Sequence, residues 1–168
     1  MPHRTSTLTM NAKALRTEAL YAICTAGVFD LVNVWRLERV CFPKDAYDLP
    51  TLFNLALMPN TLRLKAVADN HLVGYLAAEY QRYDHATWII TVGVTPQYEG
   101  RGIGHALMDC AEQHRQKGAE RMKLTVRRSN ERAIDLYRRC GYQWVGAYRG
   151  YYQDGEDGLI MEKNLTHR

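Results

Sequence analysis

The segment 92–104, VGVTPQYEGRGIG, limits the folds open to this chain more than any other part of the sequence. It continues a run of β-branched and aromatic residues at 87–94, which is typical of a strand buried on both faces. It leads directly into a helical pattern at 100–118. A helix that starts at such a turn has unpaired backbone N–H groups and a dipole that favours anions. We therefore expect a phosphate or pyrophosphate site within an α/β fold.

The spacing of the glycines distinguishes this turn from two other known kinds of phosphate-binding loop. Gly100, Gly102 and Gly104 form GxGxG, which is one position short of the dinucleotide fingerprint GxGxxG. The Gly-Lys-Ser/Thr of a nucleotide P-loop is absent. Glycine has no β-carbon, so a ligand can approach this backbone closely. Taken alone, the turn also fits a glycine-rich connection without any ligand.

The remaining pattern predicts a single α/β domain with a mixed sheet. Strands are expected at 18–25, 62–80 (as a hairpin), 87–94, 121–126, 142–148 and 159–162, and helices near 28–40, 48–58, 100–118 and 130–140. In the first of these helices, the apolar residues Val28, Leu31, Val32, Trp35 and Val40 follow a helical spacing. Residues 1–17 are polar and aperiodic, so we expect a loose lead-in before a domain at 18–168.

Charge and composition exclude several classes of function. The net charge of +4 suits an anionic ligand but is too small to indicate nucleic acid as a partner. No window approaches 18 uninterrupted apolar residues and no secretory signal opens the chain, so we expect a cytoplasmic protein without a membrane partner. The four cysteines are far apart in sequence, which argues against a metal site or a redox pair.

Gln97, Gly100 and Gly102 resemble the Q/R-x-x-G-x-G/A signature of the GCN5-related N-acetyltransferase (GNAT) superfamily. The resemblance implies a single domain with a mixed, mostly antiparallel central sheet flanked by helices, and acetyl-CoA as cofactor. It also implies a strand that bulges near Gly93 and then splays, with a backbone N–H of 92–94 on the thioester oxygen. The implied cofactor-binding residues are Val92, Gly93, Val94, Gln97, Glu99, Gly100, Arg101, Gly102, Ile103, Gly104 and Asn130.

The segment 124–142, LTVRRSNERAIDLYRRCGY, is similar to a second block of the same superfamily. Asn130 suits a helix N-cap, and Ala133, Ile134 and Tyr137 follow on the same helix face. A core tyrosine is one explanation of Tyr137. The resemblance implies another, in which its phenol, protonated at neutral pH, donates to the sulfur of the departing thiolate.

Two further segments resemble the subgroup that acetylates protein N-termini, which includes the ribosomal-protein-alanine acetyltransferases. They are CFPKDAY at 41–47 and YRGYYQDGEDGLIM at 148–161. The resemblance implies an acceptor groove lined by Phe42, Pro43, Tyr47, Tyr151 and Tyr152. The alternative is that these aromatic residues only cover hydrophobic surface.

Thr125 occupies a position where such relatives commonly carry a glutamate or histidine as general base. Threonine cannot serve as a base at neutral pH. Glu79 on the neighbouring strand is our expected replacement, although it could equally be an ordinary exposed carboxylate.

The sequence therefore predicts an enzyme that transfers acetyl from acetyl-CoA to a primary amine by direct attack on the thioester. The expected acceptor is the N-terminal α-amine of a peptide or protein, and the expected state is a monomer or homodimer. A small amine, such as a polyamine, amino acid or antibiotic, is the alternative acceptor. A CoA-binding protein that has lost its catalytic base is a non-enzymatic alternative.

Overall fold

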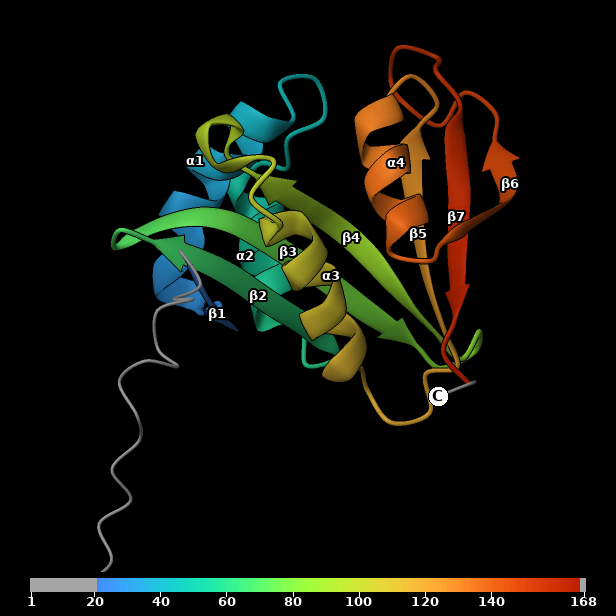
Figure 1. The fold of residues 1–168 in the computed structure, drawn as a ribbon, viewed down its shortest axis with the longest axis horizontal. Helices are drawn as coiled ribbons and strands as arrows, with labels where there is room; N and C mark the ends of the chain where they lie inside the picture. The colour runs from blue at the N-terminus through green and yellow to red at the C-terminus, as the bar shows by residue number, and fades with distance from the viewer. Residues whose placement is uncertain (1–20, 167–168) are drawn as a thin grey trace, which may run out of the picture.

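The computed structural model describes residues 21–166, and the expected lead-in at 1–17 lies outside them. A seven-stranded sheet forms its centre, in the order β1-β2-β3-β4-β5-β7-β6 (Figure 1). The strands are β1 (Ala22–Thr25), β2 (Thr61–Ala68), β3 (His71–Gln81), β4 (Ala86–Val94), β5 (Arg121–Arg127), β6 (Gln143–Tyr148) and β7 (Gly158–Asn164). Only β4 and β5 pair in parallel, and all other neighbours are antiparallel. The predicted mixed, mostly antiparallel sheet is confirmed.

Four helices cover the two faces of this sheet. The first pair, α1 (Leu31–Cys41) and α2 (Leu49–Leu57), packs on one face around Tyr75 and Ala77 of β3. The second pair, α3 (Ile103–Gln113) and α4 (Glu131–Arg139), covers the opposite face, where Leu76 and Ala78 are buried. Successive residues of a strand point to opposite faces, so β3 is buried on both sides. No helix in 21–166 has the length and apolar character needed to cross a membrane.

The helix ends follow from local chemistry. At α4, Oδ1 of Asn130 accepts the N–H of Ala133 at 3.1 Å, which confirms the predicted N-cap. By contrast, α3 begins at Ile103, three residues later than expected. Gly100 and Gly102 have φ angles of 75° and 80°, and this left-handed backbone cannot belong to an α-helix.

Three of the apolar residues with helical spacing in 28–40 are exposed in the structure. Val28, Val32 and Val40 are 43%, 50% and 54% exposed, whereas Val34 and Glu38 are buried. The segment Val28–Asp30 forms a 3-10 turn rather than the first turn of the α-helix. Within the α-helix, Val34, Leu37 and Glu38 follow the i, i+3, i+4 spacing of one face, and Val32 and Val40 lie off it. A carboxylate, Glu38, therefore lies on the buried face of α1.

β4 and β5 separate shortly after they meet. They pair only over Ala86–Ile89, and Figure 1 shows the two strands side by side at one end and diverging toward the other. The bulge in β4 is at Ile90, which is skipped in the register with β3, so the expected bulge near Gly93 is wrong. Gly93 instead permits a close approach of α1. A β-carbon there would lie 3.1 Å from Sγ of Cys41 and 3.2 Å from the ring of Phe42.

Candidate active site

The N-terminus of α3 has free backbone donors. Unlike α2 and α4, it has no side-chain cap, and its first helical bond runs from the N–H of Ala106 to the carbonyl of Gly102 at 2.9 Å. The N–H groups of residues 103–105 therefore have no partner within the helix. A β-carbon at Gly100 would meet nothing within 4 Å, so the positive φ, not packing, requires glycine at this position. Together with the helix dipole, this turn can hold an anion.

A cleft of about 610 Å³ extends from this turn along the free end of β4 to α4. It brings together most of the residues predicted to bind the cofactor, which are Val92, Gly93, Val94, Glu99, Gly100, Gly102, Ile103, Gly104 and Asn130. Gln97 and Arg101 are not in its lining. The guanidinium of Arg101 instead donates to the carbonyl of Gln97 at 3.1 Å, which closes the turn on itself.

Three basic side chains that the sequence did not single out also line this cleft. They are His105 on α3 and Arg132 and Arg139 on α4. Arg132 forms an ion pair with Glu99 of the turn, so the cleft is bridged at this point by opposite charges. These residues lie near helix ends, and no distinctive sequence motif marks them. The additional cationic groups make the large cleft suited to a ligand with several negative charges.

A smaller pocket of about 160 Å³ lies on the α1 side of the sheet. Of the residues predicted to line the acceptor groove, Phe42, Tyr47, Tyr151 and Tyr152 line this pocket, and Pro43 does not. Its lining also includes Glu38, Asp45, Thr91, Thr125 and Arg127, none of which was predicted as an acceptor-site residue. The two cavities share Phe42, Val92, Asn130, Ala133 and Tyr137, so they meet where β4 and β5 have separated.

Tyr137 lies at this junction. Its side chain belongs to the core beneath α4, with only 7% of the residue exposed, and it lines both cavities. Burial raises the pKa of its phenol above the ordinary value, and the nearby Tyr152 and Cys140 act in the same direction. The phenol is therefore protonated at neutral pH and can donate a hydrogen bond into the junction.

Glu79 does not reach either cavity. It lies in β3 between its sheet partners Thr61 and Trp88, at the end of the sheet where β4 still pairs with β5. The lining of both cavities is formed by other residues, so the expected role of Glu79 as base has no support in its position. The sequence could not show this, because the register of the strands decides which end of β3 lies near the gap between β4 and β5.

The small pocket contains two carboxylates, Asp45, which is paired with Arg127, and Glu38, which has no cationic partner among the described residues. Glu38 is 1% exposed, its Oε1 accepts the hydroxyl of Thr91 at 2.6 Å, and its Oε2 accepts the N–H of Tyr47 at 3.4 Å. Desolvation raises its pKa, while these two hydrogen bonds act in the opposite direction. None of the ion pairs between residues 21 and 166 includes Glu38. One sequence signal could have found it, since it is an acidic residue at helical spacing from Val34 and Cys41.

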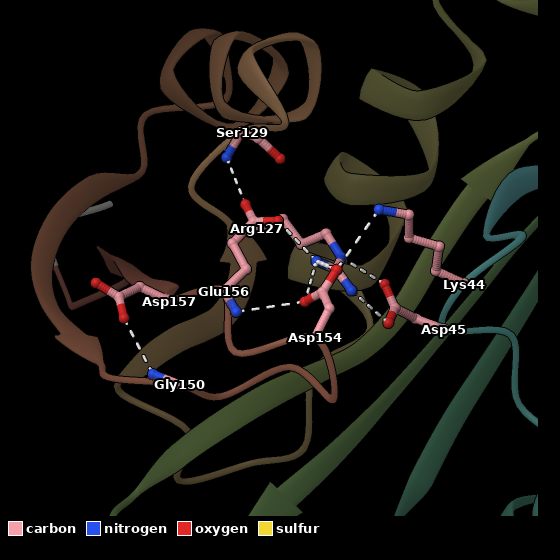
Figure 2. A network of polar contacts seen from close by, with 8 residues as sticks. All are labelled: Lys44, Asp45, Arg127, Ser129, Gly150, Asp154, Glu156 and Asp157. Atoms are coloured by element: carbon pink, nitrogen blue, oxygen red, sulfur yellow. Dashed lines mark hydrogen bonds and ion pairs between the residues drawn. The ribbon is translucent and has the colours of Figure 1, made fainter.

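Arg127 joins the two walls of the small pocket (Figure 2). Its Nε and Nη2 donate to the carboxylate of Asp45 in the α1–α2 loop at 2.6 and 2.7 Å. Its Nη1 donates to Asp154 at 3.0 Å and to Glu156 at 2.7 Å, both in the β6–β7 loop. The guanidinium also lies 4.0 Å from the ring centre of Tyr152. We call Arg127 and its three carboxylate partners the Arg127 cluster.

The Arg127→Ala variant should have a lower urea midpoint at pH 7 than Arg128→Ala, whose side chain is 60% exposed and pairs only with Asp157. Hydrogen bonding from Arg127 lowers the pKa of Asp154. Its stabilisation is therefore present above the ordinary carboxyl pKa near 4 and is lost as the pH falls through the lowered pKa. The difference between wild type and Arg127→Ala should shrink below about pH 4. Equal midpoints for the two variants at pH 7 would contradict a clamping role.

Comparisons with known proteins agree with this geometry. The profile of the "Acetyltransferase (GNAT) family" matches residues 30–142. An N-alpha-acetyltransferase from Sulfurisphaera tokodaii is 39% identical over 162 residues, covering 86% of this chain and 93% of that protein.

Two solved structures share the fold. The ribosomal-protein-S18-alanine N-acetyltransferase from Escherichia coli superposes with a TM-score of 0.76 at 22% identity, covering 88% of this chain and 96% of the other. Arabidopsis thaliana NAA60 in complex with acetyl-CoA gives a TM-score of 0.77 at 20% identity, covering 86% and 98%. With a family profile spanning most of its length, this chain belongs to the GNAT family of N-acetyltransferases.

Proposed function

We propose that this enzyme transfers an acetyl group from acetyl-CoA to the N-terminal α-amine of a peptide or protein. One observation carries the proposal: the large cleft and the small pocket meet at Phe42, Val92 and Tyr137. A thioester held in the first and an amine held in the second would come together at this junction. Direct attack then needs no covalent enzyme intermediate, which agrees with the raised pKa that leaves Cys41 beside the junction a protonated thiol.

The large cleft suits the donor. The free N–H groups at the start of α3 would hold the diphosphate of acetyl-CoA, supported by Arg132 and Arg139. Beyond Ile89, β4 has no partner on its β5 side, so its outward backbone groups can bind the pantetheine arm. A backbone N–H in 92–94 would donate to the thioester oxygen as negative charge develops there.

Gly102→Ala should weaken binding of acetyl-CoA by at least about tenfold, because an alanine held at φ of 80° costs about 1–3 kcal/mol and would displace the turn. Titration calorimetry with acetyl-CoA measures this directly. Gly155→Ala is a matched control, since Gly155 has a φ of 82° and no neighbour within 4 Å but lies in the β6–β7 loop. Equal affinities for Gly102→Ala and wild type would refute the diphosphate site.

Tyr137 is suited to hydrogen-bond the leaving sulfur. An alkyl thiol has a pKa of about 8.5, whereas a phenol starts at about 10, and burial raises the pKa of Tyr137 further. Complete proton transfer from Tyr137 to the thiolate would therefore be uphill by more than about 2 kcal/mol. We propose that Tyr137 stabilises the sulfur by donating a hydrogen bond while the carbon–sulfur bond breaks.

Replacing Tyr137 by phenylalanine should lower kcat by about 10²-fold or more, with the KM for acetyl-CoA changed little, because only the charged leaving group loses a donor. Steady-state kinetics with a peptide acceptor tests this. Tyr142→Phe is the control: the ring centre of Tyr142 lies 6.2 Å from that of Tyr137, but Tyr142 lines neither cavity. Unchanged turnover in Tyr137→Phe would exclude the role.

The acceptor pocket favours a small amine terminus with a low pKa. Its volume of about 160 Å³ is below the range of pockets that enclose drug-sized ligands. It is instead comparable to one or two residues of an extended chain. At pH 7 an α-amine with a pKa near 8 costs about 1.4 kcal/mol to deprotonate, whereas lysine at about 10.4 costs about 4.6 kcal/mol.

A panel of acceptors tests this choice. We expect short peptides with free N-termini to have a kcat/KM at least about tenfold above N-terminally blocked peptides with an internal lysine. Polyamines, free amino acids and aminoglycoside-type amines complete the panel. Faster acetylation of one of these small molecules than of every peptide would establish the alternative acceptor class.

A further inference from the structure

We propose that Glu38 receives the proton that the acceptor ammonium must lose before it attacks the thioester. This inference rests on the proposed transfer to an amine and identifies the base within the small pocket. Three observations support it: the position of Glu38, the absence of a paired cation, and the chemistry of its neighbours.

The position is the first observation. Glu38 lines the pocket that also contains Phe42 and Tyr137, the residues shared with the large cleft. An amine bound in this pocket would share one small cavity with Glu38 and with the junction residues Phe42 and Tyr137. Thr125, in the same lining, has a hydroxyl that cannot accept a proton at neutral pH.

The charge of Glu38 is not neutralised by the residues around it. Arg127 is the basic side chain in the pocket lining, and its guanidinium is already shared by the carboxylates of the Arg127 cluster. A buried carboxylate without a cation is costly, so an incoming ammonium would be attracted to it. The same pairing holds the amine in place until one proton has moved.

The groups that face Glu38 are otherwise uncharged at neutral pH. They come from every element packed around it: Cys41 on α1, Tyr47 in the α1–α2 loop, Tyr75 on β3 and Thr91 on β4. Asp45, in the same pocket, is bound to Arg127. Burial raises the pKa of Glu38 toward that of the amine, which makes proton transfer less uphill than to an exposed carboxylate.

The protons balance in this scheme. Of the three on the ammonium, one moves to Glu38 and is later released to solvent. The neutral nitrogen forms a bond to the thioester carbon, and the carbon–sulfur bond breaks while Tyr137 hydrogen-bonds the sulfur. The second proton leaves the nitrogen and ends on the thiolate, which gives CoA, and the third remains on the amide.

The test compares Glu38→Gln with Glu79→Gln across pH 6.5 to 9, using a short peptide with a free N-terminus and acetyl-CoA. Glutamine can accept the N–H of Tyr47 with its amide oxygen and donate its NH2 to the hydroxyl of Thr91, but it cannot take a proton. We expect kcat/KM of Glu38→Gln to fall by about 10²-fold at pH 7. The deficit should shrink toward pH 9, because water then deprotonates the amine. Glu79→Gln should match wild type throughout.

An aminooxyacetyl peptide, whose amine is already neutral at pH 7, gives an independent measurement. Its acetylation should be much less affected by Glu38→Gln than that of the ordinary peptide. A merely structural role would instead lower both rates equally at every pH. Calorimetry with acetyl-CoA and a thermal melt report whether the variant is folded.

Thr91→Val provides a second variant that keeps the carboxylate. The Thr91 hydroxyl stabilises the charged form of Glu38, so its removal should raise the pKa of Glu38 and move the acidic limb of kcat/KM to higher pH. An unshifted limb, or a Glu38→Gln profile parallel to wild type, would overturn the assignment. If wild type binds acetyl-CoA but acetylates no amine, the proposed function itself fails.

Discussion

The early separation of β4 from β5 is the constraint on which the rest of the structure depends. The two strands share only four paired residues, Ala86–Ile89, before the bulge at Ile90 turns β4 away. Parallel strands need a crossover, and here α3 supplies it, so the glycine-rich turn lies at the end of β4 next to the gap. The same gap admits Tyr137 from α4 and lets the two cavities meet.

Features that depend on local sequence could be predicted, and those that depend on register could not. The turn at 97–104 and the Asn130 cap were predicted because glycine conformation and capping act within a few residues. The positions of Glu38 and Glu79 were not, since one lies on a helix where the exposed Val28 and Val32 also have helical spacing and obscure the buried face. The other depends on how β3 aligns with β4, which no periodicity in either strand specifies.

The acidic side chains in and around the small pocket differ in their partners: those of the Arg127 cluster have a cation, and Glu38 has none. Three carboxylates surround Arg127 between two loops, so each of these carboxylates has a cationic partner. Glu38, by contrast, has only the neutral donors Thr91 and Tyr47. In the proposed role of Glu38, the acceptor ammonium would supply the cation that a buried carboxylate otherwise lacks.

The helix pairs on the two faces of the sheet pack against different sets of strands. The core beneath α3 and α4 includes residues from both sides of the gap, such as Leu76 and Leu124, whereas the α1–α2 core contacts only the β1–β4 side. The loops at 42–48 and 149–157 are therefore joined mainly through the partly buried Arg127 cluster, with little shared apolar packing. Outside that cluster, substitutions in these loops would leave the apolar core intact, whereas the positive φ angles of the glycine-rich turn require glycine. If the proposed sites are correct, such a scaffold can change its acceptor while its handling of the acetyl donor stays the same.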